Sequence, residues 1–189
     1  MEQSTVRTFL AYLEDRPGVL NRVTSLFRRR GFNIESLTVG RTERPGVSRM
    51  TLVVRADDDA ARRLEANLYK LVNVLAVEDV SHAPTVVREL ALIKVRANSD
   101  VRAAVMQLCE LFRARVVDVT PEALVIESTG TPDKVDGLIE MVRPYGVLEL
   151  VRTGAVAMTR GHEAHDSTAG DASDASPPAN PTASAEAAA

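Results

Sequence analysis

Apolar residues recur along this chain with two periods, which alternate in a fixed order. Short runs such as Arg7–Leu13 are typical of strands, whereas the segment from Val19 carries apolar side chains at the three- and four-residue spacing of a helix. Gly31 follows, where a helix commonly ends in a left-handed residue. In the first half we therefore expect strand 7–13, a helix from 19 to Gly31, strands 34–39 and 50–54, a helix after Asp57-Asp58-Asp59, and strand 74–80.

The same order returns after residue 84. We expect strand 89–95, a helix from Asn98-Ser99-Asp100, a hairpin of 115–119 and 124–127, a helix from Thr131-Pro132-Asp133, and strand 147–151. The repeat predicts an α+β fold of two tandem ferredoxin-like βαββαβ units, each a four-stranded antiparallel sheet with helices on one face. We place the units at 5–81 and 85–161. Each is small enough to have a marginal core alone, and bare sheet faces and edges favour dimerisation.

The last 28 residues, 162–189, differ in composition. They contain ten Ala, five acidic residues, no Lys or Arg, and no Val, Ile, Leu, Met, Phe or Tyr. Such a segment cannot bury enough apolar surface to offset the entropy of ordering, so we expect a disordered tail. The tail carries −5 and residues 1–161 carry +2, so the net charge of −3 describes no single surface.

Composition and charge exclude several classes of protein. No stretch approaches the roughly 18 apolar residues of a membrane span, and no secretion signal opens the chain, so we expect a soluble, cytoplasmic protein. The single Cys109 excludes an internal disulfide and a structural zinc site. Binding to RNA is disfavoured, because a body of +2 is weakly basic and the strand 50–54 lacks the aromatic residues on which RNA bases stack.

The sharpest local feature is the segment 14–20 (EDRPGVL), hereafter the Pro-Gly loop, between the first strand and the first helix. A helix N-terminus offers unpaired N–H groups to a carboxylate, and Gly18 lets the backbone approach a ligand closely. Asp15 can receive an ammonium group, so the loop can hold the head group of a free amino acid. The alternative is that Asp15 only caps the helix. The matching junction of the second unit, Asn98-Ser99-Asp100, has no Pro-Gly and is typical of an ordinary cap.

Other candidate groups favour structural roles. The acidic run 57–59 is expected to cap its helix rather than bind a cation, and two of Arg28-Arg29-Arg30 are expected on a solvated face. Cys109 lies on an apolar stripe and is expected in the core. His162 and His165 fall in the tail, and His82 is the one other histidine. No nucleophile motif, metal-binding motif or phosphate-binding loop occurs, so nothing predicts an active site.

These residues carry a resemblance to a known family. The stretch EDRPGVLNRVTSLFRRRGFNIESLTVG (14–40) resembles the ACT domain of acetolactate synthase (acetohydroxyacid synthase) small subunits. SRMT (48–51), LYKLVNVLAVEDV (68–80), RELALIKVRA (88–97), VVDVTPEALVIESTGTP (116–132) and RTGAVAMTRG (152–161) are similar to the later segments of that family, in order. The resemblance covers residues 5–161.

The resemblance implies a regulatory subunit without catalysis of its own. It implies that the chain stimulates a catalytic large subunit, which carries thiamine diphosphate, Mg and FAD, and confers feedback inhibition by valine, leucine or isoleucine. No cofactor is expected on this chain. The effector is expected between two ACT domains of a homodimer. A stand-alone ACT-type amino-acid sensor acting on a different partner is the alternative.

The resemblance also implies effector-binding residues. Carried over position by position, they are Asp15, Gly18, Val19 and Leu20 from the Pro-Gly loop, and Asn33 and Ile34 from the neighbouring protomer. Asp15 is expected to take the ammonium group, and the N–H groups near Gly18 the carboxylate. The family often has Asn where this chain has Asp15, and a carboxylate makes the stronger charge-assisted contact to an ammonium.

Overall fold

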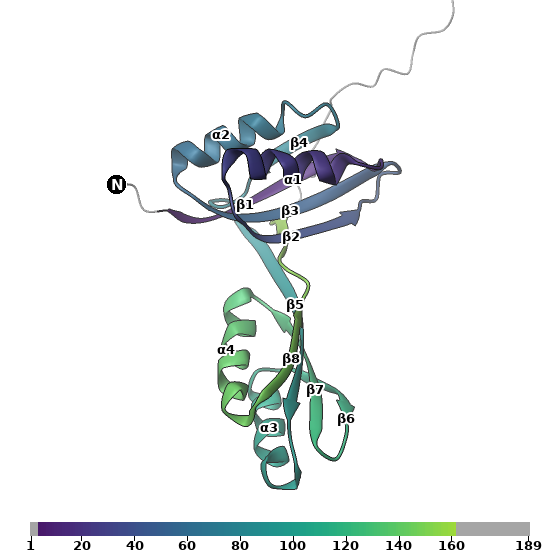
Figure 1. Cartoon of the computed structure of the whole chain (residues 1–189), viewed down its shortest axis with the longest axis vertical. Coiled ribbons are helices and arrows are strands. Elements are labelled where there is room, and N and C mark those ends of the chain that lie inside the picture. Colours follow the sequence, from purple (N-terminus) through teal and green to yellow (C-terminus); the bar gives the residue numbers. More distant parts are fainter. Residues whose placement is uncertain (1–3, 162–189) are drawn as a thin grey trace, which may run out of the picture.

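Two α+β units follow one another in this computed structural model, which describes residues 4–161 (Figure 1). The first unit, the ACT unit, contains β1 (Thr5–Glu14), α1 (Val19–Arg30), β2 (Ile34–Arg41), β3 (Val47–Ala56), α2 (Asp58–Leu68) and β4 (Val74–Asp79). The second contains β5 (Thr85–Arg96), α3 (Ser99–Leu111), β6 (Arg115–Val119), β7 (Ala123–Gly130), α4 (Pro132–Val142), the 3-10 turn η1 (Arg143–Tyr145), β8 (Val147–Arg152) and β9 (Val156–Thr159). The predicted fold class, two ferredoxin-like βαββαβ units, is confirmed.

The sheets repeat one strand order. The ACT sheet runs β2-β3-β1-β4 and the second sheet β6-β7-β5-β8, with every neighbouring pair antiparallel. In each unit the two helices cover one face of the sheet (Figure 1). Alternation along the strands sends one set of apolar side chains towards the helices, and Phe9, Leu52 and Leu64 are fully buried there in the ACT unit.

One strand was not predicted. β9 pairs antiparallel with the first four residues of β5, Thr85–Arg88, and so gives the second sheet a fifth strand instead of the expected four. β5 is longer than the predicted strand 89–95, because its N-terminal part leaves the ACT unit and runs down into the second unit (Figure 1).

Two apolar side chains near helix ends are exposed. Leu20 is 44% exposed in the first turn of α1, and Val72 is 88% exposed because α2 already ends at Leu68. Within residues 4–161, no helix is long and apolar enough to cross a membrane. The tail, with His162 and His165, lies outside the described residues.

Candidate functional site

The Pro-Gly loop connects β1 to α1 and has an unusual helix start. Gly18 is the N-cap residue of α1 and adopts a left-handed conformation, with φ 85° and ψ −8°. No side chain caps the helix, which rules out the alternative that Asp15 serves only as its cap. The Val19 N–H donates to the carbonyl oxygen of Arg16 at 3.4 Å, and the other N–H groups of the first turn have no acceptor inside the helix, so this end of α1 carries partial positive charge.

The second unit provides an internal comparison. There the Asn98 side chain accepts hydrogen bonds from the N–H groups of Asp100 and Val101, at 3.3 and 3.4 Å, so the start of α3 is capped as predicted. Of the two matching junctions, only the one in the ACT unit leaves its helix end open to a ligand.

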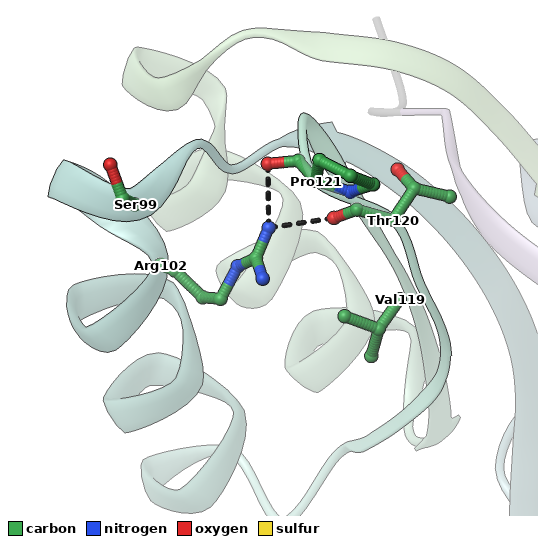
Figure 2. Close-up of a pocket in the computed structure, with 5 residues that line it drawn as sticks. All are labelled: Ser99, Arg102, Val119, Thr120 and Pro121. Atoms are coloured by element: carbon green, nitrogen blue, oxygen red, sulfur yellow. Dashed lines mark hydrogen bonds between the residues drawn. The ribbon is translucent and has the colours of Figure 1, made fainter.

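A hollow of about 490 Å³ lies beside α3, where Arg102 is held by backbone carbonyl groups (Figure 2). The Arg102 guanidinium donates to the carbonyl oxygens of Thr120 and Pro121, at 2.6 and 2.7 Å, and to that of Ala97 at 2.9 Å. Figure 2 shows this side chain reaching from α3 to the β6–β7 turn. The arrangement ties the β6–β7 turn to the start of α3, so it has a structural role.

Residues distant in sequence fix the path of the Pro-Gly loop. Glu14 donates its N–H to the carbonyl oxygen of Asn73 at 3.0 Å and accepts from the Asn73 side chain at 2.7 Å. Asn73 in turn accepts from Arg22 on α1 at 2.7 Å. The Asp15 N–H donates to Gly46 in the β2–β3 turn at 2.8 Å. The loop is therefore held from both sides, which sequence spacing did not reveal.

The Asp15 carboxylate is half-exposed and has one cation near it. Arg41, at the end of β2, places its Nε 3.6 Å from Asp15 Oδ2, and the Arg41 side chain is 90% exposed. Such a solvated pair is weak, so the carboxylate remains open to an incoming ammonium group. The sequence analysis missed Arg41, because β2 and the loop are brought together only by the strand order.

The six predicted effector residues fall into two groups. Val19 is buried in the ACT core, whereas Leu20 is exposed beside the loop. Asn33 is exposed and Ile34 packs partly against the core, both beyond the C-terminal end of α1. Because α1 has 12 residues, it is about 18 Å long, and Asn33 and the Pro-Gly loop lie at its opposite ends. One chain alone does not bring the two groups into one pocket.

The other candidate groups have structural surroundings. Asp57 caps α2 by accepting from the Ala60 N–H at 2.7 Å, Asp58 pairs with the buried Arg7, and Arg28–Arg30 are all exposed. Cys109 is buried in the second core, where burial raises the pKa of its thiol and disfavours the reactive thiolate. Among the described residues, no group of His, Cys, Asp and Glu can hold a metal ion.

Comparison with known proteins agrees over both units. The model described as "AHAS small subunit-like ACT domain" matches residues 10–76, and that described as "Small subunit of acetolactate synthase" matches residues 88–161. The acetolactate synthase small subunit of Mycolicibacterium smegmatis is 48% identical over 154 residues, covering 82% of this chain and 91% of that protein. A probable small subunit from Archaeoglobus fulgidus is 49% identical over 156 residues, covering 82% of this chain and 98% of the relative.

A solved structure extends the agreement to three dimensions. The crystal structure of the acetolactate synthase small subunit from Thermotoga maritima superimposes with a TM-score of 0.77 at 40% identity, covering 84% of this chain and 99% of that one. The two tandem units, the uncapped Pro-Gly loop and these similarities together show that the chain belongs to the family of acetolactate synthase small subunits.

Proposed function

We propose that this chain is the regulatory subunit of an acetolactate synthase and binds a branched-chain amino acid at the Pro-Gly loop. The observation that carries the proposal is the uncapped start of α1 beside the half-exposed Asp15 carboxylate. An α-amino acid carries a carboxylate and an ammonium group on the same carbon atom, so the helix end and Asp15 complement its two charges. Leu20, exposed in the first turn of α1, offers an apolar contact for the aliphatic side chain of the effector.

We further propose that the site is completed by a second copy of the chain. β2 is an edge strand of the ACT sheet. Two copies paired antiparallel along β2, centred between Leu37 and Thr38, would bring Ile34 of one copy opposite Arg41 of the other. Because Arg41 lies beside Asp15 in the same chain, such a homodimer would carry Asn33 and Ile34 to the Pro-Gly loop of the other copy.

The partner is proposed to be the catalytic large subunit of acetolactate synthase, in the cytoplasm. We expect this chain to stimulate that subunit, and bound valine, or leucine or isoleucine, to inhibit the complex. We expect thiamine diphosphate, Mg and FAD on the catalytic subunit and no cofactor on this chain. Support comes from the family to which the chain belongs.

Reconstitution with the catalytic subunit encoded by the same organism tests the proposal. The chain alone should form no acetolactate, and adding it should raise the rate of the catalytic subunit. Asp15→Ala should weaken valine binding at least tenfold by calorimetry and leave stimulation intact. Absence of stimulation, together with recovery of a different enzyme in a pull-down, would favour the stand-alone sensor instead.

A further inference from the structure

Residues 153–157, which connect β8 to β9 and include the first two residues of β9, lie against the face of the ACT sheet that the helices leave uncovered. We call this segment the strap. The Ala155 N–H donates to the side-chain oxygen of Ser36 at 2.8 Å, and the Thr38 hydroxyl donates to the carbonyl oxygen of Thr153 at 3.4 Å. Ser36 and Thr38 both belong to β2, so the strap is attached to the edge strand of the ACT sheet through its side chains.

A second attachment reaches β3. Arg49 donates from its guanidinium to the carbonyl oxygen of Ala157, and its charge lies 5.9 Å from the ring centre of Tyr12 on β1. Ala157 also packs against Leu10 and Val80 in a small buried cluster. Leu10 is only 1% exposed, although it points to the sheet face without helices, because this cluster covers it.

The close approach requires glycine at position 154. Gly154 has φ +83°, a conformation that residues with a side chain rarely adopt. A Cβ added there would lie 2.6 Å from the Ser36 side-chain oxygen and 3.2 Å from that of Thr38. Both the backbone conformation and the space therefore admit only glycine without a shift of the strap.

The strap is anchored just as firmly in the second unit. Arg152, the residue before it, donates to the buried Glu89 on β5 at 2.9 Å and to Asp136 on α4 at 2.7 Å. On its other side, the strap continues into β9, which pairs with β5 (Figure 1). Continuous contacts therefore connect β2 through the strap to both the sheet and a helix of the second unit.

We propose that the strap is the element that couples the effector site to the second unit. β2 begins at Ile34 and ends at Arg41, 3.6 Å from Asp15, and the strap holds this strand between the two ends. An amino acid bound between two copies would act on β2, and Ser36 and Thr38 would carry the change into the strap. This inference rests on the proposed function and adds the route by which binding reaches the rest of the molecule.

The test compares Gly154→Ala with the matched control Gly161→Ala in the full chain, reconstituted with the catalytic subunit. Gly161 also has a positive φ, +106°, but nothing lies within 4 Å of its added Cβ. For Gly154→Ala we expect valine to bind within threefold of the wild-type affinity by calorimetry. The extent of inhibition at saturating valine should fall at least threefold, and hydrogen exchange should rise along β9. Gly161→Ala should behave as wild type.

A second variant opens the strap without backbone strain. Ser36→Ala combined with Thr38→Val removes both β2 contacts and changes little else, and it should reproduce the loss of inhibition even if Gly154→Ala folds poorly. Full inhibition in this double variant, with faster exchange along β9, would overturn the coupling role while leaving the proposed function intact. A wild-type complex that neither binds valine nor is inhibited by it would overturn the proposed function, and the coupling with it.

Discussion

Gly18→Ala separates the fold requirement at the start of α1 from its proposed role in binding. Gly18 has φ 85° and no atom within 4 Å of the position an added Cβ would take. The substitution therefore introduces no clash in the free chain, and its cost to folding is conformational. The left-handed conformation costs a residue with a side chain about 1–2 kcal/mol, and the reduced entropy of the unfolded chain offsets about 0.4–1 kcal/mol of this.

The expected loss of stability is thus about 1 kcal/mol, which lowers the Tm of a unit of this size by about 4–8 °C. Binding should suffer more, because the added methyl group stands where a carboxylate must approach the first-turn N–H groups. We expect valine to bind at least tenfold more weakly, a loss of about 1.4 kcal/mol. Thermal melts measure the loss of stability. Calorimetry, carried out well below the Tm of both the wild type and the variant, measures the loss of valine affinity separately.

Gly146→Ala is the control for strain alone. Gly146 also has a positive φ, 96°, and its added Cβ would meet only the Arg96 Cβ, at an ordinary contact distance of 3.8 Å. It should lower the Tm without changing valine affinity. If Gly18→Ala bound valine as tightly as the wild type, or if both variants lost affinity equally, the Pro-Gly loop would not be the binding site.

Three further substitutions test the electrostatics. Arg41→Met should tighten valine binding up to about fivefold by calorimetry, because the Asp15 carboxylate is then no longer paired with a neighbouring cation. Such exposed pairs contribute up to about 1 kcal/mol. Weaker binding would show instead that Arg41 contacts the effector. Glu89→Gln should destabilise the chain by about 2 kcal/mol in denaturant unfolding, since it removes the buried one of the two carboxylates that pair with Arg152. The exposed control Glu149→Gln should change the unfolding midpoint little. Burial, with the nearby charges of Asp79 and Glu78, raises the pKa of Glu65, so the native chain binds this proton more tightly than the unfolded one and loses stability as pH rises through that pKa. Glu65→Gln should therefore be more stable than the wild type at pH 7, by roughly a few tenths of a kcal/mol because the side chain is only partly buried. The difference in unfolding free energy should vanish near pH 4. A variant that is less stable than the wild type at pH 7 would contradict the raised pKa of Glu65.

Much of the fold could be predicted because it depends on local patterns. The helical spacing from Val19 and the cap at Asn98 are properties of short segments, and the structure confirms both. The sequence predicted less well where a helix ends and whether an apolar side chain is buried, because both depend on the neighbouring elements. α2 stops at Leu68 before the apolar Val72, and Leu20 stays exposed although its spacing fits the core side of α1.

The candidate site shows the same division. A helix that starts at a Pro-Gly sequence is visible in the residues, and so is a carboxylate three positions before Gly18, but only the structure shows that no side chain caps this helix. The contact between Asp15 and Arg41 and the support from Asn73 were not visible, because 26 and 59 residues separate the partners. Such contacts depend on strand order, which periodicity does not specify.

The sequence by itself determined the two βαββαβ units, the position of the Pro-Gly loop in one of them and the capped junction in the other, since each follows from backbone preferences within a few residues. The tertiary structure alone decided the strap. RTGAVAM (152–158) has no strong helix or strand period, and its form comes from Ser36, Thr38 and Arg49, more than 100 residues earlier. A positive φ at Gly154 and a side-chain oxygen 2.6 Å from its missing Cβ become meaningful only once the two units are placed together.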